Sequence, residues 1–344
     1  MNGRFTLSPK EIRSIKSLTS AIAAQYKSAE DDDFLFNAPV YAHELPRPMR
    51  EFLNDFRMRE WSDGYCLISG YPIDQTKIGP TPSHWKERRK PPLTIEEEIL
   101  LILYGSLLGD VFSWSTQQAG FVVHNIMPIK SDENEQLGTG SKQLLWWHNE
   151  DAFHSFRGDY LGMMCLRNPD RVATTISCID NVELDEKQKT LLFEPHFVIH
   201  PDESHLEKNR GIVESNSGED EDAINASYKK ILEMRNIPQK TSVLFGNFDS
   251  PYIQLDPYFM PKIDHLEAQE ALDKLVRSLE GEIKEVVLQP GDYFFIDNFK
   301  AVHGRKPFQA RYDGADRWLL RINVTRDMRK SRSARNPCTS RVIQ

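Results

Sequence analysis

Hydrophobic positions in the first hundred residues follow a helical period. Ser8, Pro9 and Glu11 form a helix-start signal, because these residue types stabilise the free N–H groups of a first turn. The apolar residues that follow recur every three or four positions, at Ile12, Ile15, Leu18 and Ile22. A similar start at 94–97 precedes the almost wholly apolar run 99–108, which indicates a buried helix. Between them, the turn-bounded segment 61–71 predicts a strand.

From about residue 120 the pattern changes to short β-rich runs separated by turn residues. These runs are FVVHNI, ATTISCI, HFVIH, SVLFG, EVVLQPGDYFFID and WLLRINVTRD. The Pro-Gly order within Gln289–Asp292 predicts a type II turn that joins two antiparallel strands. Segment 266–279 has the spacing of an inserted helix. The pattern therefore predicts an α+β fold, mainly β, with a sandwich or barrel core and flanking helices.

We expect one domain over residues 1–344, with a helical N-terminal part at about 1–110 and a β core at about 111–327. An insertion at about 207–240 contains the acidic stretch 215–222, which is predicted to be a solvated loop or a lid over a ligand. The basic residues 328–344 are predicted to be a solvated tail, because a short basic patch without interleaved aromatics is weak evidence for RNA binding.

The net charge, the apolar segments and the cysteines limit the partners and the environment that we expect. Lys and Arg total 43 against 51 Asp and Glu, so the formal net charge of −8 argues against nucleic acids and anionic membranes as partners. The apolar run 99–108 is only about half as long as a helix that spans a bilayer, so we expect no membrane span. The four cysteines form no CxxC pair and are expected to be buried free thiols. We expect a cytoplasmic protein, and the oligomeric state stays open, a homo-oligomer included.

The candidate chemistry begins in the stretch WWHNEDAFH. On an extended chain His148 and Glu150 share a face and could hold one ion. His303, in AVHGR after a predicted strand, completes an HxE...H pattern, which is the two-histidine, one-carboxylate triad of non-haem Fe(II) oxygenases. Downstream, Arg317 is placed to bind the distal carboxylate of 2-oxoglutarate. His196 and His200 are a weaker metal pair, because no Glu lies between them as in HExxH.

Longer stretches of the chain resemble a known family. They are AHELP, LLGDVFSWSTQQ, WHNEDAFH, LRNPDRVATT, PDESHL and FIDNFKAVHGRKPFQARYDGADRWLLRINVTRD. They are similar to the clavaminate synthase-like Fe(II)/2-oxoglutarate oxygenases that hydroxylate free amino acids, above all to arginine and lysine hydroxylases. The resemblance implies a double-stranded β-helix, or jelly-roll, core. It also implies Fe(II) as the metal, with 2-oxoglutarate and O2 as cosubstrates.

Residue by residue, the resemblance implies that iron is bound by His148, Glu150 and His303. It implies that 2-oxoglutarate is bound by Arg317 and Thr174. The amino acid substrate is then expected to contact Arg321 through its carboxylate, one of Gln117 and Gln118 through its amino group, and Asp256 and Tyr258 at its far end.

The substrate prediction depends on Tyr258. Arginine hydroxylases of this group have a second aspartate where this chain has Tyr258, two residues after Asp256. A guanidinium suits two carboxylates, whereas one carboxylate can balance an ammonium. The sequence therefore predicts hydroxylation of free L-lysine at C4 or C3, with succinate and CO2 as co-products.

Three alternatives remain at this point. The substrate could instead be L-arginine or an arginine-derived amino acid, hydroxylated at C3. A non-catalytic β-barrel that binds an amino acid would need no redox metal. A zinc hydrolase with the same three ligands would not need Arg317. Glu150 argues against a halogenase, because related halogenases lack this carboxylate.

Overall fold

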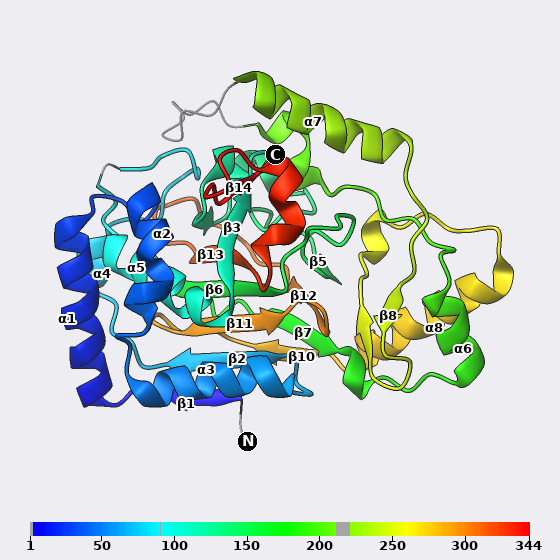
Figure 1. The fold of residues 1–344 in the computed structure, drawn as a ribbon, viewed down its shortest axis with the longest axis horizontal. Helices are drawn as coiled ribbons and strands as arrows, with labels where there is room; N and C mark the ends of the chain where they lie inside the picture. Colours follow the sequence, from blue (N-terminus) through cyan, green and yellow to red (C-terminus); the bar gives the residue numbers. More distant parts are fainter. Residues whose placement is uncertain (1–2, 90, 211–220) are drawn as a thin grey trace.

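Two β-sheets flanked by helices form the centre of the molecule (Figure 1). The computed structural model describes residues 3–89, 91–210 and 221–344. The two sheets pack through apolar side chains such as Met163 and Phe294 on the larger sheet and Ile176 on the smaller one. This arrangement of mixed sheets and helices is consistent with the predicted double-stranded β-helix.

The larger sheet has its long strands at the middle, where both faces are covered. Its order is β1 (Arg4–Thr6), β2 (Tyr65–Ser69), β11 (Tyr293–Asp297), β6 (Tyr160–Arg167), β13 (Trp318–Thr325), β3 (Asp110–Trp114) and β14 (Val342–Ile343), with β4 (His124–Ile126) also paired to β13. The prediction missed β6, because a strand buried on both faces shows no alternation of polar and apolar residues. The strand predicted within 61–71 is confirmed as β2, whereas β1, which pairs with it, was not predicted.

The smaller sheet carries part of the candidate site. Its order is β10 (Lys284–Val286), β7 (Thr174–Cys178), β12 (Ala301–Arg305) and β5 (Leu145–His148). The turn at Gln289–Asp292 forms as predicted, since Gly291 has φ 88° and the Asp292 N–H donates to the Gln289 carbonyl at 2.9 Å. The predicted hairpin was wrong, however. The turn connects β10 of the smaller sheet to β11 of the larger sheet.

Helices from the N-terminal part cover one face of the larger sheet. They are α1 (Pro9–Gln25), α2 (Asp32–Ala42), α3 (Arg47–Arg59), α4 (Gln75–Ile78) and α5 (Ile95–Leu108). The predicted capping box at Ser8 and Glu11 is confirmed. Helix α5 packs on β13 and is enclosed by α1, α2 and α3, which explains its uniform hydrophobicity. Its start differs from the prediction, because the Thr94 hydroxyl donates to Glu98 at 2.6 Å and does not cap the helix.

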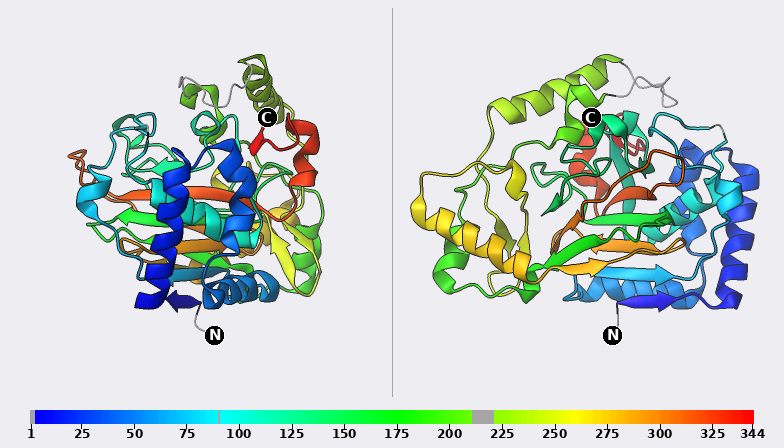
Figure 2. Two further views of the ribbon diagram at one scale, coloured as in Figure 1. Left: turned by 60° about the vertical axis from the view of Figure 1, so that its left-hand side comes forward. Right: turned by 180° about the vertical axis from the view of Figure 1, so that it is seen from behind.

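A second helical layer lies at the opposite end of the molecule from α1, as the two turned views agree (Figure 2). It contains α6 (Glu186–Phe193), the predicted α8 (Leu266–Gly281) and the hairpin of β8 (Leu244–Gly246) with β9 (Pro251–Ile253). The predicted strand at 196–200 is only an isolated bridge between Phe197 and Thr241. Most of the predicted acidic loop or lid, 215–220, lies outside the described residues, and the rest begins α7 (Glu221–Asn236).

Short 3-10 helices complete the described elements: η1 (Gln118–Gly120), η2 (Lys130–Asp132), η3 (Ile179–Asn181), η4 (Glu203–His205), η5 (Glu207–Asn209), η6 (Pro257–Phe259) and η7 (Met328–Ala334). The prediction of a solvated C-terminal tail was wrong. Strand β14 pairs in parallel with β3, and the buried Arg335 donates to the carbonyls of Met328, Cys338 and Ser340. Arg335 therefore serves packing, whereas Arg329, Lys330 and Arg332 are exposed.

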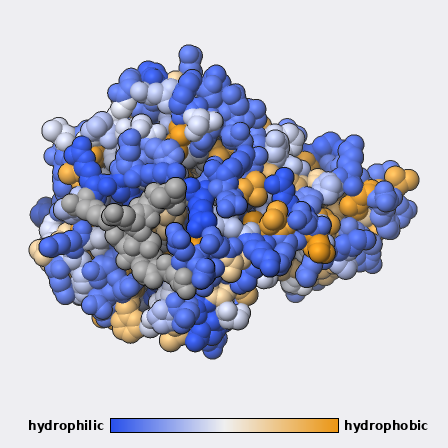
Figure 3. Space-filling view, turned by 90° about the horizontal axis from the view of Figure 1, so that it is seen from above, coloured by the Kyte–Doolittle hydropathy of each residue, from blue (hydrophilic) through white to orange (hydrophobic). Residues whose placement is uncertain are grey.

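The surface agrees with the acidic, polar composition. Hydrophilic residues cover most of the face seen from above (Figure 3). Among the described residues, no helix has the length and apolar character needed to cross a membrane. The predicted burial of free thiols holds for Cys66, Cys165 and Cys178, whereas Cys338 is exposed.

Candidate active site

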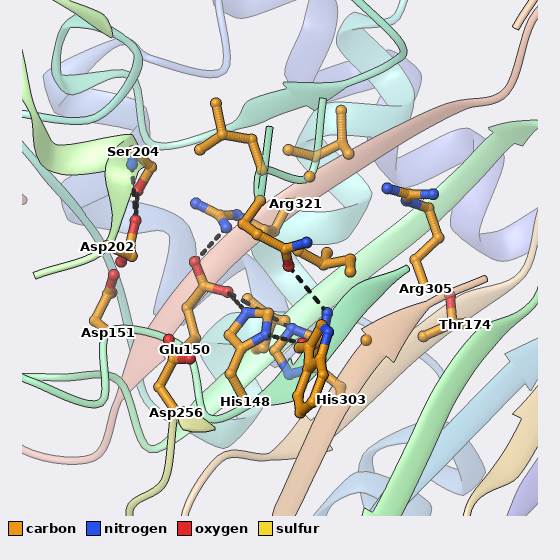
Figure 4. A pocket seen from close by; sticks show the side chains of 18 of the residues that line it. His148, Glu150, Asp151, Thr174, Asp202, Ser204, Asp256, His303, Arg305 and Arg321 are labelled. Atoms are coloured by element: carbon orange, nitrogen blue, oxygen red, sulfur yellow. Dashed lines mark hydrogen bonds and ion pairs between the residues drawn. The ribbon is translucent and has the colours of Figure 1, made fainter. Parts of the chain in front are cut away.

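Three predicted metal ligands meet in a pocket beside the smaller sheet (Figure 4). His148 on β5 lies directly opposite His303 on β12 in the strand register, and their ring centroids are 4.6 Å apart. Glu150 follows β5, and its Oε2 lies 3.8 Å from Nε2 of His148 and 3.6 Å from Nε2 of His303. One ligand atom from each residue can therefore reach a common point.

Two buried asparagines hold the Glu150 turn in place. The Asn298 side chain accepts from the Glu150 N–H at 2.7 Å and donates to the Glu150 carbonyl at 3.0 Å. Asn149 donates to the carbonyls of Asn298 and Ala301 at 2.9 and 3.0 Å. These bonds tie the turn after β5 to the connection between β11 and β12, so the carboxylate is positioned relative to both histidines.

The donor set fits a divalent iron ion. Two imidazole nitrogens and one carboxylate on one side of a metal leave positions for other ligands, which is the facial-triad pattern. Nδ1 of His148 lies 2.7 Å from the Trp146 carbonyl, which directs Nε2 toward Glu150. Burial lowers the pKa of His303 to about 4, so its ring is neutral at pH 7. Burial also disfavours the protonated form of His148, but the adjacent Glu150 carboxylate outweighs this effect and raises the pKa of His148 to about 9. Metal binding would displace that proton.

One end of the pocket is cationic. Arg317, at the start of β13, donates from Nη2 to the Thr174 hydroxyl of β7 at 3.5 Å. Arg305 of β12 lies opposite Thr174 in the register and also lines the pocket. Burial lowers the pKa of Arg317 to about 10 and of Arg305 to about 9, so both stay charged at neutral pH. Within the described ranges neither forms an ion pair, and the Nε of each lacks a hydrogen-bond partner.

Arg305 was not predicted as a pocket residue. Its signal was available, because Arg305 is two positions after His303 and alternate residues of a strand share a face. Two buried cations without a carboxylate partner make this end suited to an anion.

The middle of the pocket contains Arg321. It shares a face of β13 with Arg317, as the spacing predicted, and it forms an ion pair with Glu150. Its Nη2 also donates to Gln117 Oε1 at 3.2 Å and to His124 Nδ1 at 2.7 Å. Burial and the adjacent Arg321 charge hold the pKa of His124 well below its usual range, so this ring accepts.

The two candidate glutamines differ in direction. Gln117 is joined to Arg321 and donates to the Ser204 hydroxyl at 2.7 Å. Gln118 turns away and exchanges two hydrogen bonds with the backbone of Asn125, at 2.9 and 3.0 Å. Of the pair, Gln117 is the one bonded to residues that line the pocket, although it is not itself a lining residue.

The far end of the pocket is anionic. The buried Asp256 precedes η6, and burial raises its pKa to about 7. Asp202 and Ser204, at the start of η4, line the same pocket, and so does Asp151. No Lys or Arg of the described chain forms an ion pair with Asp202 or Asp256. Tyr258 lines the opening and is 52% exposed.

Three of these pocket residues, Asp151, Asp202 and Ser204, were not predicted from the sequence. Asp202 and Ser204 are in PDESHL, one of the stretches that carried the resemblance, and Asp151 directly follows Glu150. Their relation to Asp256 could not be read from spacing, because these segments are far apart in the chain.

Comparison with known proteins identifies the family of the chain. The model of the taurine catabolism dioxygenase TauD, TfdA family matches residues 195–323. The chain is 42% identical over 343 residues to an L-ornithine/L-arginine 3-hydroxylase from Catenulispora acidiphila, covering 99% of each. It is 40% identical over 338 residues to an enduracididine beta-hydroxylase from Streptomyces hygroscopicus, covering 98% of each. The chain belongs to the TauD/TfdA family.

This TauD/TfdA oxygenase also matches a solved structure over almost its whole length. The non-heme iron oxygenase OrfP, in complex with Fe, succinate and (3S)-hydroxy-L-Arg, has a TM-score of 0.92, 44% sequence identity and 99% coverage of each chain. Another OrfP structure contains Fe and alpha-ketoglutaric acid. The predicted enzyme class, amino acid hydroxylases that depend on iron and 2-oxoglutarate, is confirmed, and these are the cofactors of this oxygenase.

Proposed function

We propose that this oxygenase hydroxylates free L-arginine at C3, with 2-oxoglutarate and O2 consumed and succinate and CO2 formed. The observation that carries the proposal is the pair of carboxylates, Asp202 and Asp256, at the far end of the pocket. A guanidinium has five N–H donors in a planar fork and can bind both carboxylates at once. An ammonium is a compact charge that needs only one.

The prediction of lysine rested on counting acids near Asp256 in the sequence. Tyr258 stands where a second aspartate was expected, but Asp202 supplies a carboxylate from a different segment. The comparisons favour the same correction. An L-lysine 3-hydroxylase from Catenulispora acidiphila is 28% identical to this chain, well below the 42% of the ornithine/arginine enzyme.

The proposed iron ligands are His148, Glu150 and His303. Iron, when bound, supplies the activation of O2 that is coupled to decarboxylation of 2-oxoglutarate. The role of the chain is to place two organic molecules beside this point and to exclude others.

The cationic end suits the cosubstrate. The distal carboxylate of 2-oxoglutarate would bind Arg317 through two parallel hydrogen bonds and accept another from the Thr174 hydroxyl. Both residues are almost completely buried, so water competes little for these contacts.

Arg321 and Gln117 suit the amino acid end of the substrate. Arg321 would bind the α-carboxylate, and the Oε1 atom of Gln117 can accept from the α-ammonium. With the guanidinium at Asp202 and Asp256, the substrate is held at both ends, and its β carbon lies between them. Two relatives named as a 3-hydroxylase and a beta-hydroxylase support C3 as the carbon attacked.

The test is a competition assay with arginine and lysine in one reaction, containing the iron-loaded protein, 2-oxoglutarate and air. Mass spectrometry should find that arginine gains one oxygen first, and NMR of the product should locate the hydroxyl at C3. Preferential oxidation of lysine would overturn the assignment. An amino-acid-binding β-barrel or a zinc hydrolase would release no succinate when arginine is added.

A further inference from the structure

A buried hydrogen-bonded cluster beside the pocket has no part in the chemistry assigned so far. At its centre, His205 has no exposed surface. Its Nε2 lies 2.9 Å from Asp151 Oδ1, and its Nδ1 lies 2.7 Å from the Thr116 hydroxyl. The rings of Trp114 and Phe153 pack edge-on against it, at centroid distances of 5.7 and 5.1 Å. The imidazole is thus held on both polar edges and on its sides.

Asp151 connects this cluster to Gln117 and to the pocket, which it lines. Its Oδ2 accepts from Trp114 Nε1 at 2.6 Å, and its Oδ1 accepts from Gln117 Nε2 at 3.3 Å as well as from His205. Asp151 has φ 52°, in the left-handed region that is unfavourable for most residues other than glycine. Such a conformation persists where surrounding contacts determine it, and functional sites are the usual place.

His205 ends the short helix η4, which carries two pocket residues on its N-terminal side. The Asp202 carboxylate accepts from the backbone N–H of Ser204 at 2.8 Å and from its hydroxyl at 2.5 Å. Ser204 in turn accepts from Gln117. In Figure 4, Asp151, Asp202 and Ser204 lie together on one side of the proposed iron ligands. A helix of one turn has little stability of its own, so its position depends on such contacts.

The cluster is arranged as a hydrogen-bonded anchor and not as a second metal site. Ligand atoms of Asp151, Asp202 and His205 do lie within 4.8 Å of one another. However, both ring nitrogens of His205 already have partners, and each oxygen of Asp151 accepts a hydrogen bond. A cation would have to break these bonds.

We propose that His205 is a positioning residue that, through Asp151 and Thr116, holds η4 where Asp202 and Ser204 can bind the cationic side chain of the substrate. This inference rests on the proposed function only for the identity of that side chain. His205 and Thr116 do not line the pocket, so they act without touching the substrate.

The test compares three variants of the iron-loaded protein under anaerobic conditions. His205→Leu removes both hydrogen bonds and keeps an apolar side chain. His205→Gln is the matched control, because its amide N–H can replace the Nε2 donor to Asp151. Thr116→Val removes only the second bond and keeps the shape, so it remains informative if His205→Leu does not fold.

Calorimetry should show that His205→Leu weakens L-arginine binding about tenfold to a hundredfold, as expected for a misplaced binding group. Affinity for 2-oxoglutarate, followed by the charge-transfer absorption of its iron complex, should stay within about twofold, since Arg317 and Thr174 are on other elements. We expect His205→Gln to recover most of the arginine affinity and Thr116→Val to have an intermediate effect. Hydrogen exchange of peptide 201–206 should accelerate in His205→Leu and Thr116→Val.

Unchanged arginine affinity and unchanged exchange in folded His205→Leu or Thr116→Val would overturn the proposal. An equal loss of arginine and 2-oxoglutarate binding would overturn it too, because that indicates a general structural role. Two iron ions per chain in the wild type, with one lost in His205→Leu, would identify a metal site instead. If the wild-type protein binds lysine and not arginine, the proposed function fails, while the exchange measurement and lysine titrations still test His205.

Discussion

The two ends of the pocket differ in charge and in construction. The cosubstrate end contains Arg305, Arg317 and Thr174, which are in or next to regular strands of the two sheets. The substrate end contains Asp202 and Asp256, which are beside the short helices η4 and η6. In the proposed function, these opposite charges orient two ligands that are themselves charged, a dianion and a cationic amino acid. The proposed cosubstrate site is built on regular strands, and the proposed substrate site is built on short helices and loops, which tolerate substitution.

The largest loss of activity should come from the proposed iron site, which lies between the two ends of the pocket. His303→Ala removes one of three proposed iron ligands, so turnover of every amino acid should be abolished. The melting temperature of the metal-free protein should change little, because the ring packs in a pocket and not in an apolar cluster. Metal analysis and succinate assays give the result, and full activity in this variant would refute the triad.

The cationic end is tested by Arg317→Ala. Loss of one partner of a buried, charge-assisted contact typically costs about 2–5 kcal/mol, so the KM for 2-oxoglutarate should rise by at least an order of magnitude. Arginine affinity should be nearly unchanged. Arg317→Lys is the control that keeps the charge but loses the bidentate fork, and it should recover only part of the loss. An unaltered KM would move the cosubstrate to another part of the pocket.

Helix α5, which packs against β13, contains a buried glutamate whose ionisation should make the stability of the fold depend on pH. Burial raises the pKa of Glu98 on α5 from 4.5 to about 7. The folded state therefore holds this proton more tightly than the unfolded state. The contribution of Glu98 to stability should be greatest below about pH 4.5 and should decrease by on the order of 3 kcal/mol as the pH rises toward 7. Urea unfolding of Glu98→Gln should lack this decrease, and identical pH profiles for the two proteins would contradict it.

The anionic end is tested by Asp202→Asn. A hydrogen bond to a charged group contributes about 1.5–3 kcal/mol, so arginine turnover should lose roughly tenfold to a hundredfold in kcat/KM. Lysine turnover should lose less, because one carboxylate, Asp256, still balances an ammonium. Asp256→Asn is the matched variant, because it makes the same change at the other carboxylate of the pair. If Asp202→Asn leaves the preference for arginine unchanged, the two-carboxylate explanation fails.

The smallest effect is expected at Tyr258, where the sequence pointed to the largest. Tyr258→Asp adds a carboxylate at a position that is 52% exposed. Exposed ion pairs contribute about 0–1 kcal/mol, so the ratio of arginine to lysine turnover should change less than about fivefold. A shift of several tens of fold would show that Tyr258, and not Asp202, decides the substrate.

The sequence by itself determined the features that depend on residue type and local spacing. The HxE pattern and its partner His303 identified the metal chemistry, because few side chains bind iron and a strand places alternate residues on one face. The same locality explains why α1 and its capping box were predicted correctly. The α+β character also followed from the length and spacing of apolar runs, but the expected excess of β structure was wrong, since α-helices contain more residues than strands.

Only the tertiary structure decided which distant segments share a surface. Asp202 reaches the pocket of Asp256 through the fold, so counting acids beside Asp256 in the sequence missed the second carboxylate on which our proposal of an arginine substrate rests. Strand β14 pairs with β3, which lies more than two hundred residues earlier in the chain, so a basic tail that looked solvated is partly packed. Hydrophobic periodicity shows which face of a helix or strand is buried and which is exposed to water. Ion pairs and strand pairs join segments that are far apart in the chain, and the sequence does not show which distant segments lie close together in the fold.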